Sequence, residues 1–468
     1  MPVLGFTGFL WAGAAAAAPT GPTPEGGPQT SAQGTAPQSD ISSASTAPET
    51  APVFERYAFH GQATLVEQFH PGFHSAYSGT NSLDSGRRGN ETFDLTFYGG
   101  FRPWNDAEVW VNPELDQGFG LSNTVGIAGY PSGEAYKVGA SVPYVRVPRL
   151  FLRQTIDLGG KVQGIAPDLN QLGGSETANR IIGTIGKFGV GDVFDTNKYA
   201  HDPRNDFMNW AAVDGGAFDY AADAWGYTYG LSLEWYRNWW TLRAGLFDGS
   251  VTPNSKYLEF PLGRQLQGVV EAEARYALFG QSGKVKLLGF LTHAKLGTFS
   301  ELARFFAANP NASGADAAVA RHPRDKFGAA LNVEQPITAD LGAFLRASLS
   351  DGRTEAYDFT DIDRSIAAGL SLAGNRWNRS DDTFGVAFIV NNISKVHKDY
   401  FAQGGIGVLV GDGKLVHAGP EQILETYYSF AVRAGINVSA EYQLVNHPAY
   451  NVDRGPVHIF GGRMHVQF

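Results

Sequence analysis

The chain contains no cysteine, and this absence excludes a disulfide framework, thiolate metal sites and a cysteine nucleophile. Charged side chains are also scarce: they make up 18% of the 468 residues, whereas ordinary globular domains carry about 25%. Basic residues (36) are fewer than acidic residues (46), which gives a net charge of -10. A chain with this charge is disfavoured as a partner of nucleic acid.

Long hydrophobic runs are missing as well. No apolar stretch long enough for a membrane helix, about 18 residues, occurs after residue 20. Glycine and aromatic side chains are abundant instead, with 58 Gly, 31 Phe, 19 Tyr and 9 Trp. Among membrane-spanning architectures, this composition is compatible only with a β-barrel. No shift in composition after the first fifty residues marks an internal boundary, so one large folded unit is expected.

The N-terminal residues differ from the rest of the chain. Residues 1–18 are apolar and end in small residues, with Ala15 and Ala17 as a cleavage motif, and are predicted to be a secretory signal peptide that lacks a basic n-region. A frayed apolar terminus is the alternative. Residues 19–53 are rich in Pro, Ser and Thr and are predicted to be a disordered tether, because they bury too little surface to offset their conformational entropy. The barrel domain is expected over residues 54–468.

The folded part of the chain shows a hydrophobic period of two. In residues 92–98, Phe93, Leu95 and Phe97 share one face, which is the pattern of a strand with one apolar side. The pattern predicts sixteen strands, at residues 59–69, 91–101, 106–115, 147–157, 180–190, 224–236, 239–248, 266–278, 284–295, 325–336, 341–351, 364–373, 383–391, 421–433, 436–446 and 457–468. Their length suits a tilted bilayer crossing of about 9 to 11 residues better than soluble strands of about 5 to 6.

The connections between these strands alternate in length, as periplasmic turns and outer loops do in outer-membrane barrels. Residues 158–179 are the exception: they are either an elaborated turn or a sign that the barrel has about fourteen or eighteen strands. The predicted fold is an all-β, transmembrane, antiparallel up-and-down β-barrel of about sixteen strands with long extracellular loops. A soluble sandwich or propeller is the alternative, but aromatic residues at strand ends, such as Trp104 and Trp239, are typical of membrane-interface girdles.

A barrel of this width leaves an aqueous channel unless loops plug it. The predicted lumen face carries both Arg and acidic residues, which suits a neutral solute rich in hydroxyl groups. Trp110, Trp235 and Tyr427 are candidate platforms for a pyranose ring or ordinary wall aromatics. Residues 186–226 are expected to fold inward as a constriction. Their acidic residues match no calcium loop, so no metal site is predicted.

Several long runs resemble the carbohydrate-selective porin family, the OprB-like group. These runs are NPELDQGFGLSN at 112–123, GYPSGEAYK at 129–137, PRLFLRQTIDLGG at 148–160, GKFGVGDVFDTNKYAHDPRNDF at 186–207, WGYTYG at 225–230, ETYYSF and the closing GGRMHVQF. The resemblance spans essentially residues 57–468. It implies a sixteen-stranded outer-membrane channel for monosaccharides or oligosaccharides, with a loop constriction of Arg and acidic residues, no enzyme activity and no cofactor.

The expected function is passive, carbohydrate-preferring diffusion through a bacterial outer-membrane porin that is exported through the periplasm. A general or ion-selective porin is the alternative. The candidate pore-lining residues, taken from the matched runs and the predicted lumen face, are Glu108, Trp110, Asn112, Glu114, Arg146, Arg153, Asp195, Asn197, His201, Arg204, Arg243 and Arg433. A barrel hydrolase that uses Glu271 and Glu273 is disfavoured, because no nucleophile elbow or metal-binding His pair accompanies them.

The expected partners are small carbohydrate solutes, outer-membrane lipid and the barrel assembly machinery. The C-terminal strand ends at Phe468 on its apolar face, as is typical of chains that this machinery inserts. A homotrimer and a monomer both remain open.

Overall fold

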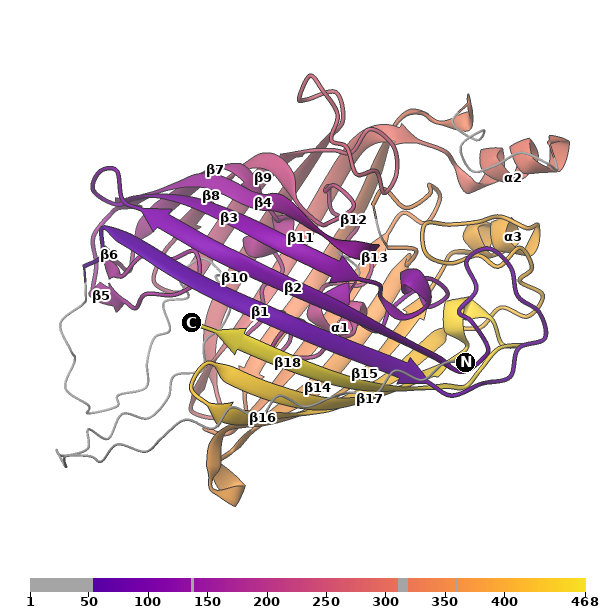
Figure 1. The fold of residues 1–468 in the computed structure, drawn as a ribbon. Helices are drawn as coiled ribbons and strands as arrows, with labels where there is room; N and C mark the ends of the chain where they lie inside the picture. The colour runs from indigo at the N-terminus through magenta and orange to yellow at the C-terminus, as the bar shows by residue number, and fades with distance from the viewer. Residues whose placement is uncertain (1–53, 136–138, 310–318, 359) are drawn as a thin grey trace. The chain divides into compact units, whose positions relative to one another are not determined.

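The computed structural model describes residues 54–135, 139–309, 319–358 and 360–468. Sixteen strands form one closed barrel (Figure 1), and each pairs antiparallel with its two neighbours. The barrel strands are β1 (Tyr57–His70), β2 (Arg88–Phe101), β3 (Ala107–Gly118), β4 (Ala140–Asp157), β7 (Arg180–Phe188), β8 (Thr228–Tyr236), β9 (Trp240–Asp248), β10 (Leu266–Leu278), β11 (Gln281–Leu296), β12 (His322–Pro336), β13 (Leu341–Ser350), β14 (Arg364–Gly374), β15 (Arg379–Asn392), β16 (Glu421–Arg433), β17 (Ile436–Asn446) and β18 (Val457–Gln467). The predicted fold and strand count are confirmed.

The remaining elements lie in the connections. They are the hairpin strands β5 (Val162–Ile165) and β6 (Gly174–Thr177), the helices α1 (Trp210–Val213), α2 (Phe299–Ala308) and α3 (Lys395–Ala402), and the short 3-10 turns Leu121–Thr124, Val190–Asp192, Asn375–Trp377 and Pro448–Tyr450. Of the helices in the described residues, none has the length and apolar character of a membrane span. The predicted signal peptide and tether, residues 1–53, lie outside the described residues.

The exceptional connection at residues 158–179 is an elaborated turn. It holds the separate two-stranded sheet of β5 and β6, so it adds a hairpin without changing the barrel count. The short turns, this hairpin and the C-terminal end of β18 lie at one end of the barrel, and α2 and α3 lie at the other (Figure 1). The first end is therefore periplasmic and the second extracellular.

Closure of the barrel depends on the two terminal strands. β1 pairs with β18 from Gln62 opposite Gln467 to Phe69 opposite Phe460. Gly61 and Phe468 extend the ladder by exchanging two backbone hydrogen bonds of 2.8 and 2.9 Å. A Cβ at Gly61 would lie 2.4 Å from the Phe468 ring, so the absence of a side chain there lets the last residue lie flat on the seam.

The outer wall is apolar and the periplasmic rim is aromatic. Outward-facing side chains such as Leu233, Leu287 and Phe388 are exposed along the strands, and their inward neighbours are buried. Trp104 and Trp239, in two of the short turns, are 55% and 63% exposed. This arrangement is that of a membrane-embedded barrel with an interfacial girdle.

Candidate functional site: the barrel lumen

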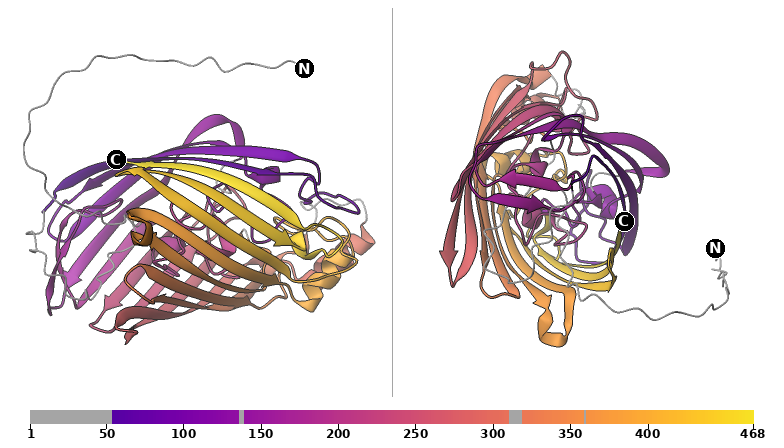
Figure 2. Two further views of the ribbon diagram at one scale, coloured as in Figure 1. Left: turned by 90° about the horizontal axis from the view of Figure 1, so that it is seen from below. Right: turned by 90° about the vertical axis from the view of Figure 1, so that its left-hand side faces the viewer.

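The long connection between β7 and β8, residues 189–227, folds into the lumen. Looking along the barrel, Figure 2 shows α1 and the segments around it inside the ring of strands. Phe194, Phe207, Trp210 and Phe218 of this connection are almost fully buried. An inward-folded loop at this place was expected from the sequence, and we call residues 189–227 the constriction loop.

Charged side chains of the wall bind the backbone of the constriction loop. Arg346 of β13 donates to the carbonyl oxygens of Asp195 and Ala212 at 2.7 Å and also to that of Ala200. From β18, Arg463 donates to three loop carbonyls, those of Pro203, Asp206 and Asn205, at 2.7, 2.8 and 3.0 Å. Because peptide groups of a buried loop need hydrogen-bond partners, these wall charges fix the loop in place and are themselves removed from the channel.

A second connection, between β3 and β4, also enters the lumen. The carboxylate of Glu421 on β16 accepts hydrogen bonds from the backbone N–H groups of Ala128 and Gly129 at 2.9 and 2.7 Å. A Cβ at Gly129 would lie 2.7 Å from the side-chain amide of Asn391, so this close approach requires glycine. Two folded-in loops therefore narrow the lumen from different sides.

A cluster of polar and aromatic side chains lies where β4 meets the constriction loop. Tyr144, Arg146 and Arg149 come from β4, and Asp192 and Trp225 come from the constriction loop; we call these five residues the polar-aromatic cluster. All five are partly exposed, unlike most charged residues of the lumen. The cluster therefore presents two guanidinium groups, a carboxylate and two aromatic rings to the water-filled space.

Hydrogen bonds and ring contacts hold this cluster together. Arg149 forms a bidentate pair with Asp192, with Nε–Oδ2 and Nη2–Oδ1 distances of 2.7 and 2.6 Å. Trp225 donates from Nε1 to the Tyr144 hydroxyl at 2.9 Å, and the Arg146 guanidinium carbon lies 5.7 Å from the centre of the Trp225 indole. In the Arg149–Asp192 pair the opposite charges balance, and N–H donors lie beside carboxylate acceptors.

The comparisons with known proteins agree with this geometry. A family model described as "Carbohydrate-selective porin, OprB family" matches residues 80–468. The chain belongs to this family. It is a porin of the bacterial outer membrane with a preference for sugars, as the sequence predicted. No curated protein matches the chain.

One solved structure shows the same fold at low sequence identity, and a second structure is less similar. The high-pH structure of Pseudomonas putida OprB has a TM-score of 0.66 and 16% identity, and the match covers 88% of this chain and 94% of that one. The outer-membrane channel DcaP of Acinetobacter baumannii has a TM-score of 0.47 and 11% identity, with 88% of this chain and 97% of that one covered.

A bulge in β4 explains why this porin directs three Arg side chains of that strand to the lumen. Glu114 on β3 is opposite Arg146, but Asn112, two residues earlier, is opposite Arg149, three residues later. The extra residue in β4 shifts the alternation of inward and outward side chains. Arg146 and Arg153 therefore both face inward, although one has an even and the other an odd residue number. Strict alternation from Arg153 also places Arg149 inward, but it does not place Arg146 there; Pro148, which cannot donate to a ladder, is the sequence signal for the irregularity.

Most of the predicted lining residues lie in the lumen but are buried by the porin's own loops. Arg243 pairs with Glu234, Glu271 and Glu273 at 2.8 to 3.0 Å. Asp195 accepts from Asn332 at 2.7 Å, and the Asn332 side chain in turn accepts from Asn197 at 2.7 Å. These residues secure the constriction loop and do not line a free passage.

The periplasmic part of the lumen collects a second group of predicted residues. Glu108 lies 3.6 Å from Arg153 and accepts a hydrogen bond of 2.8 Å from the Trp110 indole. Arg153 also donates to the carbonyl oxygen of Asn170 in the β5–β6 hairpin at 2.7 Å. Asn112 is fully buried, and its side-chain amide has no partner among the described residues. This hairpin therefore partly covers the periplasmic opening.

Four sequence-based assignments change in the structure. Arg433 is exposed at the end of β16, where the pairing with β17 is irregular, so it does not face the lumen. None of the three candidate sugar platforms offers a ring to the channel: Trp110 and Tyr427 are buried at 0% and 2% exposure, and Trp235 lies on the outer wall. The aromatic side chains of the polar-aromatic cluster are instead Trp225 and Tyr144.

The pKa values of His201 and Asp206 in the constriction loop are shifted. Desolvation, together with the nearby Arg346 charge, lowers the pKa of His201 to about 4. Burial, followed by the neighbouring Asp202 charge, raises the pKa of Asp206 to about 6. Among the described residues, no group of His, Asp or Glu side chains is arranged to hold a metal ion.

Proposed function

We propose that the polar-aromatic cluster is the sugar-contacting surface of this porin. The observation that carries the proposal is the contrast in exposure within the lumen. Wall charges such as Arg243 and Arg346 are buried against the constriction loop, whereas Arg149, Asp192 and Trp225 remain partly open.

The chemistry of the cluster suits a neutral sugar. Each sugar hydroxyl both donates and accepts, and the Arg149–Asp192 pair supplies donors and acceptors side by side. The indole of Trp225 offers an apolar face to the C–H side of a pyranose ring. Because the charges are paired, an ion of either sign gains little from entering, while a polyhydroxylated solute gains hydrogen bonds.

Conductance with added sugar tests this proposal. In planar bilayers, maltose or glucose should reduce the current through the wild-type channel in a saturable manner, and Trp225→Ala should weaken the block about tenfold, as expected for loss of about 1.4 kcal/mol of stacking. Lys414→Ala, which changes an exposed loop cation, serves as the matched control. An equal block of wild type and Trp225→Ala would contradict the assignment of the cluster.

Liposome swelling separates sugar preference from general diffusion. The wild-type porin should admit sugars faster than amino acids of similar size, and Arg149→Ala should reduce this preference because it leaves Asp192 without its partner. Equal rates for sugars and amino acids in the wild type would favour the general porin.

We also propose that this porin has no catalytic activity. The two carboxylates that suggested a hydrolase, Glu271 and Glu273, both pair with Arg243, and Glu271 also accepts from the backbone N–H of Asp195 at 2.8 Å. Both groups are nearly fully buried, which leaves no position for a substrate bond or an attacking water. Glycoside hydrolysis by the purified wild-type porin would refute this proposal if the Glu271→Gln variant lacked the activity.

Export and assembly complete the proposed function. Residues 1–18 are proposed to direct secretion and residues 19–53 to serve as a tether to the barrel domain at 54–468. The exposed ring of Phe468 at the closing seam supports a role for the last strand in recognition by the assembly machinery. Phe468→Ala should lower the amount of heat-resistant barrel in outer-membrane fractions. The mass of the wild-type porin in mild detergent would distinguish a monomer from a homotrimer.

A further inference from the structure

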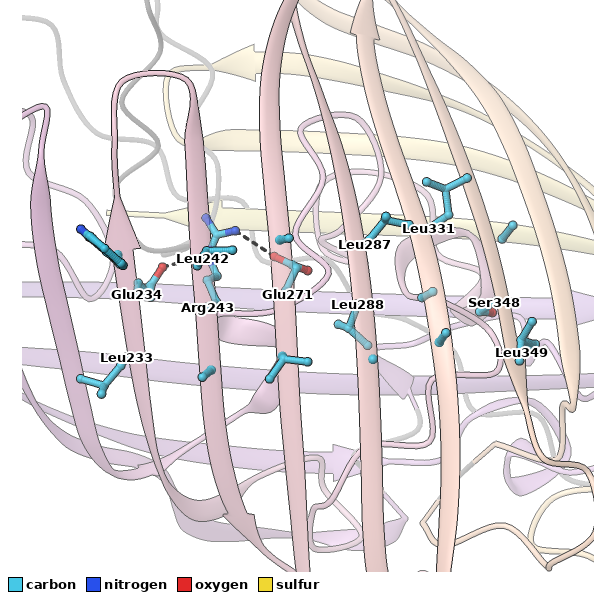
Figure 3. A pocket seen from close by; sticks show the side chains of 18 of the residues that line it. Leu233, Glu234, Leu242, Arg243, Glu271, Leu287, Leu288, Leu331, Ser348 and Leu349 are labelled. Carbon is cyan, nitrogen blue, oxygen red and sulfur yellow. Dashed lines mark hydrogen bonds and ion pairs between the residues drawn. The ribbon is translucent and has the colours of Figure 1, made fainter.

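The outer wall of the barrel carries an apolar groove of about 1140 Å³ across strands β7 to β14. Figure 3 shows the groove from close by, with aliphatic side chains along several neighbouring strands. Leu233, Leu242, Leu287, Leu331 and Leu349 contribute to its lining. The charged residues in the same view, Glu234, Arg243 and Glu271, alternate with them and pair with one another.

Three small residues contribute to the groove, in one row of the wall that also contains Val270. Ala244, Gly289 and Ala329 face outward at the same level of the sheet, because Val270 is opposite both Ala244 and Gly289, and Gly289 is opposite Ala329. The next row toward the periplasm carries leucines on three of these strands instead. The missing side-chain volume therefore leaves a depression between bulky neighbours.

The groove connects the two edges of the membrane span. The row that contains Ala244, Gly289 and Ala329 continues through Leu349 to Arg364, the first residue of β14, which follows the extracellular connection from β13. In the other direction the groove reaches Trp235, one residue before the end of β8 at a short periplasmic turn. Because the strands are tilted, a row that follows their hydrogen bonds crosses the wall obliquely from one interface to the other.

Arg364 provides a charge at the extracellular end of the groove. Its side chain is exposed, and it lines the groove together with Ile366. Among the ion pairs of the described residues, Arg364 has no acidic partner. An unpaired cation at the level of the lipid headgroups attracts an anionic group, and phosphate suits the planar guanidinium best.

We propose that this groove binds an outer-leaflet lipid with a phosphorylated headgroup, placing an acyl chain along the row of small residues and the phosphate on Arg364. A narrow, flexible methylene chain fills a shallow groove, whereas the convex wall of a second barrel would leave it empty. Since an acyl chain is equally apolar elsewhere in the bilayer, selectivity comes from dispersion contacts in the groove and from the phosphate contact.

Native mass spectrometry of the full-length porin in detergent tests this inference, with lipid A and dephosphorylated lipid A as probes. The wild type should retain lipid A about fivefold better than the dephosphorylated form, the ratio expected for one cation near a headgroup. The Arg364→Ala variant should retain lipid A and dephosphorylated lipid A equally. The double variant Gly289→Leu, Ala329→Leu should reduce retention of both probes; a Cβ at Gly289 meets only Val270, at 3.9 Å, so the barrel tolerates it.

Two control variants test whether the effects on lipid retention are specific to the groove. Lys161→Ala removes another exposed cation, and Ala440→Leu enlarges an exposed residue on β17, outside the groove. Both should retain the lipids as the wild type does. Unchanged retention of lipid A by Arg364→Ala, or of both probes by the double variant, would overturn the proposal. A dimer that is detected for the wild type and lost in the double variant would also overturn the proposal and indicate a second copy as the occupant. Sugar block of the current reports the proposed channel function separately.

Discussion

Arg204 of the constriction loop lies 2.7 Å from Glu134 of the β3–β4 connection, so one ion pair joins the two segments that narrow the lumen. The same guanidinium lies 3.4 Å from Asp94 and 3.7 Å from Glu114 on the barrel wall. Glu114 in turn pairs with Arg146 of the polar-aromatic cluster. The width of the passage therefore depends on a buried network that includes residues from β2, β3, β4 and both loops.

Arg204→Ala should loosen both loops. The variant leaves Glu134, Asp94 and Glu114 buried without this cation, a change that typically costs about 3 to 5 kcal/mol. We expect a lower temperature for loss of the folded barrel on gels and a larger, noisier single-channel conductance. Arg304→Ala, on the exposed surface of α2, is the control and should match the wild type. Wild-type conductance in Arg204→Ala would show that other contacts alone fix the loops.

Glu114→Gln should shift the channel toward anions. The change removes one negative charge beside Arg146 and Arg204 while preserving most of the side-chain volume. Interaction between unit charges near 4 Å in water amounts to about 1 kcal/mol, so the anion-to-cation permeability ratio should rise by up to about fivefold. Reversal potentials in a salt gradient measure this ratio. Glu67→Gln, on the outward side of β1, should leave it unchanged.

His201 should make the constriction loop less stable as the pH falls. Its pKa of about 4 in the folded state lies below the ordinary value of 6.5, so the unfolded state binds more protons between these values and stability is lost as pH falls from about 6.5 to about 4. His201→Gln should remove this contribution. Thermal melting at pH 7 and pH 4.5 should show a smaller decrease in the variant than in the wild type.

Asp206 should change the stability with pH in the opposite direction to His201, so variants of both residues are measured together. Its pKa of about 6 lies above the ordinary 3.8, so its stabilising effect is present at low pH and is lost as pH rises through about 6. Asp206→Asn should therefore make the decrease in stability on acidification larger than in the wild type. The same decrease in His201→Gln and in the wild type would contradict the altered pKa of His201.

Gly129→Ala should displace the β3–β4 connection. The added Cβ would lie 2.7 Å from Asn391 and 2.9 Å from Ile423, and such overpacking costs about 1 to 3 kcal/mol. A lower melting temperature and an altered conductance are expected. Gly462→Ala is the control, since a Cβ there meets nothing within 4 Å. If both variants melt at the wild-type temperature, the connection is less tightly packed than its geometry indicates.

The alternating pattern of the sequence was sufficient for the barrel itself. Residues 92–98 and their counterparts in fifteen other segments predicted every barrel strand, because one side of each strand faces lipid and the other faces polar groups. The inward position of residues 186–226 was also predicted, since a polar-aromatic stretch of this length has no place on the outer wall.

Tertiary structure decided which lumen residues remain accessible. Arg243 and Arg149 are both inward arginines, yet Arg243 is buried among three glutamates, whereas Arg149 remains partly exposed. A period of two gives the side of the wall on which a residue lies, but burial depends on loops that return from distant parts of the chain. The bulge that lets Arg146 face inward together with Arg149, and the register that aligns Ala244, Gly289 and Ala329, likewise arise from pairing between strands, which a single sequence does not encode residue by residue.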